Sequence, residues 1–248
     1  MIVNSTDLKN NLGKYLRLSA REEIIITSNG KKIAKLSAYE DIGKTPKNGN
    51  RILYEQAPVY DMTPRKASYE EFLKLAADSN ERYEYIDGEI YLLSSPKAIH
   101  QKILSELHFI FYNWFQEKKC RPFFAPFDIT LKRNSDNINV VQPDLMVICD
   151  LEKNLDERGY YMGIPTLVVE IISESSRSKD LIKKLDLYMS TGVKEYWIIN
   201  PLNQEVSVYL FKENNIRQNA TYKKNEPAFS YYFTGLELSL TQIFAPRA

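Results

Sequence analysis

The sequence predicts a mixed α/β protein in which a small N-terminal domain precedes a larger one. Three observations support this prediction. Segments with helical spacing of apolar residues alternate with short β-rich runs. Some runs, such as residues 167–169, are continuously apolar, as in strands that are buried on both faces of a sheet. Finally, residues 43–50 form a polar segment rich in glycine, proline and asparagine, which is typical of a linker.

Charge changes at the same point of the chain. The whole sequence carries 33 Lys and Arg against 32 Asp and Glu, a formal charge of +1. Residues 1–50 carry nine basic and five acidic residues, or +4, so the remainder carries −3. We therefore expect a domain at residues 1–43, a linker at 44–60 and a second domain at 61–248.

The N-terminal region predicts one helix and one hairpin. Leu8, Leu12, Tyr15 and Leu16 recur on one face of a short helix. Two β-rich runs, 23–27 and 32–36, flank an Asn-Gly pair that suits a tight turn. About 40 residues bury little surface alone, so we expect this domain to oligomerise.

The larger domain alternates helices and strands. Ser68 and Glu71 form a capping box that opens a short helix through about Ala77. A strand pair follows in residues 82–93, turning at Asp87 and Gly88. The pattern then predicts helices at 96–117 and 179–190, strands at 123–131, 140–148, 166–172, 195–199 and 205–211, and a strand-rich end with a short terminal helix.

Two acidic residues interrupt strands that are otherwise apolar. Asp144 follows Pro143 inside residues 140–148, and Glu170 lies inside residues 166–172. A carboxylate in such a strand is costly unless it is paired, hydrogen-bonded or bound to a cation. Singly, each acid could face solvent at a sheet edge or pair with a basic residue. Together they could converge on one divalent ion, and oxygen ligands favour Mg²⁺ or Mn²⁺ over zinc.

Two adjacent lysines lie on the helix predicted at 179–190. Lys183 lies nearly opposite its apolar face, whereas Lys184 lies at the border of that face beside Tyr188. We therefore expect Lys184 to lean towards the sheet and Lys183 to be solvated. A lysine near a metal-bound phosphate can orient the attacking water and stabilise negative charge. An ordinary surface lysine with a buried stem is the alternative.

Three further titratable residues have simpler explanations on pattern alone. His100 lies on the apolar stripe of the long helix, where a core histidine is the common case. Glu84 and Glu89 lie in the strand pair, and alternation would make both face solvent.

An ordered set of motifs resembles the Uma-type restriction-endonuclease family of the PD-(D/E)XK nuclease superfamily. The motifs are YEYIDGE at 83–89, His100-Gln, QPDL at 142–145, LVVEIIS at 167–173, KLDLY at 184–188 and GVKEYWIINP at 192–201. The resemblance covers about residues 60–245 and implies a central mixed sheet flanked by helices. It implies that Asp144 and Glu170 are metal ligands. Ile172 stands where the superfamily usually has its lysine, and Lys184 matches the migrated lysine of this family. Glu84 and His100 match other recurrent positions near the metal.

Residues 1–42 resemble the N-terminal domain of Phd/YefM-type antitoxins, through STDLKNNL at 5–12 and IIITSNGKKIAKL at 24–36. Such domains dimerise and bind operator DNA. The +4 charge suits phosphate contacts, although a solvated basic face is the alternative. The candidate DNA-binding residues are Lys9, Lys14, Arg17, Lys31 and Lys32. The long toxin-neutralising tail of a full antitoxin is replaced by the nuclease-like domain.

Composition and segment patterns point to the cytoplasm. No run reaches the roughly 18 apolar residues of a membrane helix, and the start of the chain lacks the pattern of a secretory signal. Cys120 and Cys149 are too few for a disulfide scaffold or a four-ligand zinc site. We therefore expect a soluble protein of a reducing cytoplasm.

The preferred hypothesis is an Mg²⁺- or Mn²⁺-dependent endonuclease acting on DNA, with an N-terminal domain for DNA binding and dimerisation. Two other hypotheses stay open. One is a DNA-binding or regulatory protein with an inactive nuclease fold. The other is a toxin–antitoxin-type fusion in which the first domain restrains the second. Basic residues that could line a groove in the nuclease domain are Arg121, Lys132, Arg133, Arg177 and Lys179.

Overall fold

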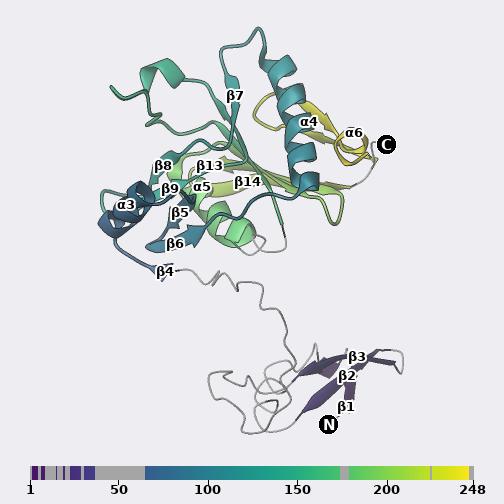
Figure 1. Cartoon of the computed structure of the whole chain (residues 1–248). Helices are drawn as coiled ribbons and strands as arrows, with labels where there is room; N and C mark the ends of the chain where they lie inside the picture. Colours follow the sequence, from purple (N-terminus) through teal and green to yellow (C-terminus); the bar gives the residue numbers. More distant parts are fainter. Residues whose placement is uncertain are drawn as a thin grey trace. The chain divides into compact units, whose positions relative to one another are not determined.

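The structure is a computed structural model of the chain, which divides into two compact units, Met1–Val59 and Tyr60–Ala248 (Figure 1). The linker predicted at residues 44–60 lies outside the described residues. Those are residues 2–4, 7–8, 15, 19, 23–28, 31–36, 65–173, 179–223 and 225–245.

The first unit contains a three-stranded sheet in the order β1-β2-β3. Strands β2 (Ile24–Ser28) and β3 (Lys31–Leu36) pair antiparallel, which confirms the predicted hairpin. Strand β1 (Ile2–Asn4) pairs parallel with β2 and has no counterpart in the sequence prediction. The Asn-Gly turn itself lies outside the described residues.

The core of the first unit is small. Val3, Tyr15 and Ile24 are buried, and Leu8 and Leu36 pack against them. Leu8 and Tyr15 are both helical, in agreement with the predicted helical face. The other two residues of that face, Leu12 and Leu16, lie outside the described residues.

The centre of the second unit is a six-stranded sheet in the order β14-β13-β12-β11-β10-β7 (Figure 1). Strands β11 and β12 are parallel, and the remaining neighbours are antiparallel, so the predicted mixed sheet is confirmed. The strands are β7 (Arg121–Phe124), β10 (Leu145–Ile148), β11 (Leu167–Ile171), β12 (Glu195–Asn200), β13 (Glu205–Lys212) and β14 (Asn215–Lys223).

Both faces of this sheet are covered. Helices α4 (Ala98–Phe115) and α6 (Leu240–Phe244) pack on one face with the inward side chains of β10, β11 and β12. Helix α5 (Leu185–Thr191), which continues from a π-helical turn at Lys179–Lys184, packs on the other face. Because neighbouring residues alternate between the two cores, β11 and β12 are buried along their whole length.

A second, five-stranded sheet shares the core on the α5 side, in the order β4-β6-β5-β9-β8. Its strands are β4 (Arg65–Lys66), β5 (Tyr83–Ile86), β6 (Glu89–Leu92), β8 (Ile129–Lys132) and β9 (Ile138–Val141). Helix α3 (Tyr69–Asp78) contacts β5 and begins with the predicted capping box. A short 3-10 turn, η1 (Leu151–Lys153), and a two-stranded sheet of β15 (Pro227–Phe229) and β16 (Glu237–Ser239) complete the unit.

Two strand predictions were wrong in the same way. The predicted strand 123–131 is β7 and β8, and the predicted strand 140–148 is β9 and β10. In each case the chain leaves one sheet and enters the other. A proline, Pro126 or Pro143, lies in each crossing segment, and proline lacks the N–H that would continue a ladder.

Cys120 and Cys149 form a disulfide where β7 and β10 pair. A reducing cytoplasm keeps most cysteines as thiols. This bond therefore differs from what the expected compartment predicts. No helix among the described residues combines the length and the apolar character needed to cross a membrane.

Candidate active site at the junction of the two sheets

The two acidic residues lie where the chain crosses between the sheets. Residues 142–144 connect β9 of the five-stranded sheet to β10 of the six-stranded one. Leu145 pairs with Val169, and continuing this antiparallel register by one residue places Asp144 opposite Glu170. The Ile171 amide donates a hydrogen bond of 2.7 Å to Oδ2 of Asp144. The Asp144 carboxylate therefore contacts the residue that follows Glu170 in β11, although the two acids are 26 residues apart in the sequence.

Lys184 leans into this junction, as the helical spacing predicts. Its Nζ lies 2.7 Å from Oε1 of Glu170 and 2.8 Å from Oε1 of Glu84. Only 2% of the lysine is exposed. An ammonium buried to this degree is stable only with paired anions, so the two glutamates and the lysine form one buried charge cluster.

Tyr188 supports the same cluster from one helical turn further along. Its hydroxyl donates a 2.7 Å hydrogen bond to Oε1 of Glu170, the atom that also contacts Lys184. Residues four apart lie on one helix face, so Lys184 and Tyr188 hold Glu170 together. Tyr188 has no role in the sequence prediction, although its four-residue spacing from Lys184 is the signal that indicates this contact.

The burial of Glu84 corrects the prediction from strand alternation. Glu84 is fully buried and accepts a 3.1 Å hydrogen bond from the Gln142 amide. Alternation assumes one solvated face, but β5 is covered on both faces, because Ile86 joins the α5-side core and Tyr85 packs with Phe72 of α3. The family resemblance, unlike the alternation, predicts Glu84 to lie near the site.

Glu89 and Lys183 also differ from prediction, because they form an ion pair with each other. The ammonium of Lys183 lies 5.3 Å from the centre of the Tyr91 ring as well. The hydrogen bond from Lys183 lowers the pKa of Glu89. These residues tie β6 to the π-helical turn at the surface, outside the buried charge cluster.

His100 lies beside Asp144 rather than in the core. Its Nε2 is 3.1 Å from Oδ2 of Asp144, and its side chain is 15% exposed. Its Nδ1 is buried and has no hydrogen-bond partner within the part of the chain that the structure describes. The first turn of α4 therefore delivers a titratable group to the edge of the site.

The predicted DNA-binding residues are only partly described. Lys31 and Lys32 lie exposed on β3, whereas Lys9, Lys14 and Arg17 fall outside the described residues. Of the basic residues predicted to line a groove in the larger domain, two already have partners within the chain. Arg121 donates to the Phe115 carbonyl at 2.7 Å, and Arg133 is ion-paired with two aspartates. Lys132 is exposed, and the side chains of Arg177 and Lys179 lie outside the described part.

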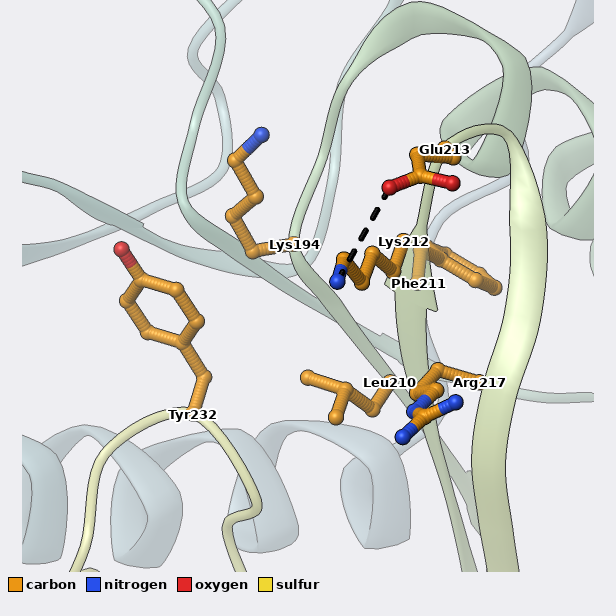
Figure 2. A pocket seen from close by; sticks show the side chains of 7 residues that line it. All are labelled: Lys194, Leu210, Phe211, Lys212, Glu213, Arg217 and Tyr232. Atoms are coloured by element: carbon orange, nitrogen blue, oxygen red, sulfur yellow. Dashed lines mark ion pairs between the residues drawn. The ribbon is translucent and has the colours of Figure 1, made fainter.

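A hollow of about 490 Å³ lies elsewhere on this unit (Figure 2). One of its lining residues, Lys194, directly precedes β12, whereas Ile198, four residues further on, is level with Glu170. The hollow and the buried charge cluster therefore lie towards opposite ends of β12. Its lining residues are Lys194, Leu210, Phe211, Lys212, Glu213, Arg217 and Tyr232.

The donor set of Asp144 and Glu170 fits a hard divalent cation. Mg²⁺ is commonly held by one or two carboxylates together with water and substrate oxygens. Within the described ranges, no group of three or more His, Cys, Asp and Glu side chains is close enough to hold a metal by itself. Two carboxylates therefore fit a water-rich Mg²⁺ or Mn²⁺ site better than a closed zinc site.

Asp128 is a further acid at this junction, and it is absent from the residues predicted from the sequence. Desolvation raises the pKa of Asp128, its hydrogen bond with the Gln142 side chain lowers it, and repulsion from Glu84 raises it. The net pKa is above the ordinary aspartate value. Gln142 thus contacts Glu84 through its backbone and Asp128 through its side chain.

Replacing Asp128 with asparagine is expected to stabilise the fold at neutral pH. A raised folded-state pKa means that the ionised carboxylate costs stability above that pKa, and asparagine removes the charge while it can keep the Gln142 contact. The gain should shrink as the pH falls towards about 4, near the unfolded-state pKa. Urea unfolding at several pH values measures it. Asp136→Asn, an exposed turn residue, is the control that loses the same charge. An equal effect in both variants would contradict the assignment.

Comparisons with known proteins agree with this architecture. The family model described as Uma2, putative restriction endonuclease, matches residues 69–241. The model of the Phd/YefM antitoxin of type II toxin–antitoxin systems matches residues 1–44. Both resemblances noted in the sequence are thereby confirmed.

Similar proteins occur in cyanobacteria. Uncharacterized protein slr1290 of Synechocystis is 27% identical over 145 residues, which are 58% of this chain and 74% of that protein. Uncharacterized protein sll1609 of the same organism is 23% identical over 140 residues, 56% and 77% of the two chains. The crystal structure of a putative nuclease belonging to DUF820 from Anabaena variabilis shares the fold. It has a TM-score of 0.58 and 24% identity, and the match covers 71% of this chain and 96% of that one.

Proposed function

Because the chain belongs to the Uma2 family of putative restriction endonucleases, we propose that it is a metal-dependent endonuclease that hydrolyses phosphodiester bonds of DNA. One observation carries this proposal. Asp144, Glu170 and Lys184 come from three separate segments and meet at one junction. A structural role alone does not require a carboxylate pair and a buried lysine at the same place.

We assign the metal to Asp144 and Glu170. A bound Mg²⁺ or Mn²⁺ would polarise the scissile phosphate and make water a stronger nucleophile at neutral pH. The chain orients both carboxylates. The Ile171 amide and His100 contact one oxygen of Asp144, while Lys184 and Tyr188 contact one oxygen of Glu170. These contacts fix the acids before substrate binds, so little reorganisation is needed at the reaction step.

Lys184 is proposed to act on the attacking water and on the developing negative charge. Its ammonium is held by Glu84 and Glu170 and has three N–H donors. Glu84 is assigned the role of keeping the lysine charged and in place. His100 is assigned to the edge of the site, where it can hold Asp144 or exchange a proton.

The N-terminal domain is proposed to bind DNA and to pair two chains, so that each could cut one strand of a duplex. The match to the antitoxin family and the exposed Lys31 and Lys32 support this role. We propose the cytoplasm as the compartment because DNA is the proposed substrate. The antitoxin match also favours a second function, in which this domain restrains the nuclease.

Cleavage of supercoiled plasmid by the purified full-length protein tests the proposed activity. We expect nicking with Mg²⁺ or Mn²⁺ and none with EDTA, because both acidic ligands require a divalent ion to act. Gel electrophoresis of the plasmid forms measures the result. No cleavage in either metal, together with retained binding in a gel shift, would favour the inactive DNA-binding protein.

Removal of residues 1–50 separates the two roles of the N-terminal domain in the same assay. Weaker binding to DNA at equal metal concentration supports delivery of the nuclease. Faster cleavage by the shortened chain supports restraint instead.

A further inference from the structure

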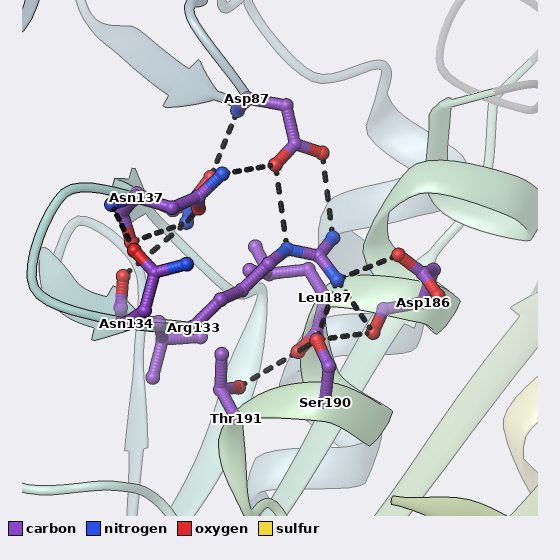
Figure 3. A network of polar contacts seen from close by, with 10 residues as sticks. Asp87, Arg133, Asn134, Asn137, Asp186, Leu187, Ser190 and Thr191 are labelled. Atoms are coloured by element: carbon purple, nitrogen blue, oxygen red, sulfur yellow. Dashed lines mark hydrogen bonds and ion pairs between the residues drawn. The ribbon is translucent and has the colours of Figure 1, made fainter.

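Arg133 connects two elements that carry residues of the candidate site (Figure 3). Its Nη1 lies 2.6 Å from Oδ2 of Asp186 and donates to Oγ of Ser190, also at 2.6 Å. On the other side, its Nη2 donates to Oδ2 of Asp87 at 3.3 Å, and its Nε lies 3.3 Å from Oδ1 of the same carboxylate. One guanidinium therefore spans the β5–β6 turn and helix α5.

The positions of its partners relate this bridge to the site. Asp87 follows Glu84 by three residues, and Asp186 follows Lys184 by two. The contact between Lys184 and Glu84 therefore joins the same two elements that Arg133 joins. The first link is buried inside the charge cluster, and the second lies nearer the surface, where the side chain of Arg133 is 18% exposed.

The Asp87 end of the bridge is itself held in place. Asn137 donates to Oδ1 of Asp87 at 3.1 Å, and the Asp87 amide donates to Oδ1 of the buried Asn139 at 2.8 Å. Asp87 has a φ of 49°, which suits its place in the tight turn. These contacts leave the carboxylate little freedom, so the arginine meets an anchored partner rather than a mobile surface acid.

We propose that Arg133 is a positioning residue that sets the place of Lys184 relative to Glu84 and Glu170. This inference rests on the proposed nuclease function. Lys184 is the last residue of the π-helical turn, and Arg133 holds the first turn of the helix that follows it. Without the bridge, α5 can shift against β5, and the ammonium shifts with it. A displacement of about 1 Å in a catalytic group can reduce the rate about 100-fold.

The test compares three variants of the full-length protein in plasmid nicking with Mg²⁺. Arg133→Gln should lower kcat about 10- to 100-fold, with KM for DNA within a factor of two. Arg133→Lys, which keeps the charge but can satisfy only part of the bridge, should recover part of this loss. Arg158→Gln is the matched control, because the exposed Arg158 pairs with Asp156 at 3.3 Å in a separate ion pair. It should behave as wild type.

A second measurement is independent of cleavage. Hydrogen exchange of the backbone amides in α5, followed by mass spectrometry, should become faster in Arg133→Gln and stay unchanged in Arg158→Gln. A wild-type kcat in Arg133→Gln, or a rise in KM alone, would overturn the positioning role. If the wild-type protein does not cleave, the proposed function fails, and unchanged exchange in Arg133→Gln would then overturn the positioning role separately.

Discussion

Replacing Lys184 with methionine is expected to abolish cleavage and to lower the free energy of unfolding by about 3–5 kcal/mol. Methionine has a similar length but no charge. The substitution leaves Glu84 and Glu170 buried with no ammonium between them, and both are within 5% of complete burial. Urea unfolding at pH 7 measures the loss of stability, and plasmid nicking well below the unfolding temperature measures the loss of activity.

A stability control must separate these two effects. Glu195 is another fully buried acid of the sheet, but it lies outside the buried charge cluster. It accepts hydrogen bonds from the Trp197 indole, the Ser230 hydroxyl and the amides of Tyr231 and Tyr232. Glu195→Gln should cost about 1–3 kcal/mol and leave the rate of cleavage unchanged. Wild-type cleavage by Lys184→Met would contradict the assignment of that lysine.

The position of Lys184 could be predicted because it depends on local geometry. Helical periodicity alone placed the lysine at the border of the apolar face, and the structure shows it leaning from there onto Glu170. Asp144 and Glu170 could likewise be recognised as the polar positions of two apolar runs, although those runs do not predict the pairing of β10 with β11. Pattern arguments succeed at such places because one element and its neighbour determine the result.

Glu84 shows where such arguments fail. Whether a strand has a solvated face depends on which sheet it joins and what covers that sheet, and no local pattern contains this information. The five-stranded sheet is completed when the chain returns to it after Phe124, for β8 and β9, and leaves it again after Val141. The prolines in those segments predict a break in each ladder but not the new partner strand.

The Arg133 bridge lies beyond sequence reasoning for the same reason. Its two acidic partners are 46 and 53 residues away in the chain. The sequence predicts Arg133 as one of the basic residues that could line a DNA groove. Only the folded structure shows that its charge is already paired with two aspartates. A basic residue is therefore weak evidence for nucleic-acid binding until its ion pairs are known.

Replacing Asp144 with asparagine is expected to reduce metal-dependent cleavage at least about 100-fold while the fold is retained. Asparagine has nearly the same shape, and its carbonyl oxygen can still accept the hydrogen bond from the Ile171 amide. What it lacks is the negative charge that strengthens the binding of a divalent cation. Calorimetric titration with Mn²⁺ measures metal binding directly, and plasmid nicking measures the activity.

Asp150→Asn is the matched control for this variant, since Asp150 lies two residues beyond the other end of β10. Its carboxylate accepts a 2.7 Å hydrogen bond from Tyr161 and takes no part in the junction. Equal loss in both variants would mean that Asp144 acts through stability alone. Unchanged Mn²⁺ binding and cleavage in Asp144→Asn would place the metal elsewhere. Loss of both in Asp144→Asn, with neither lost in Asp150→Asn, is the result that a metal ligand at position 144 requires.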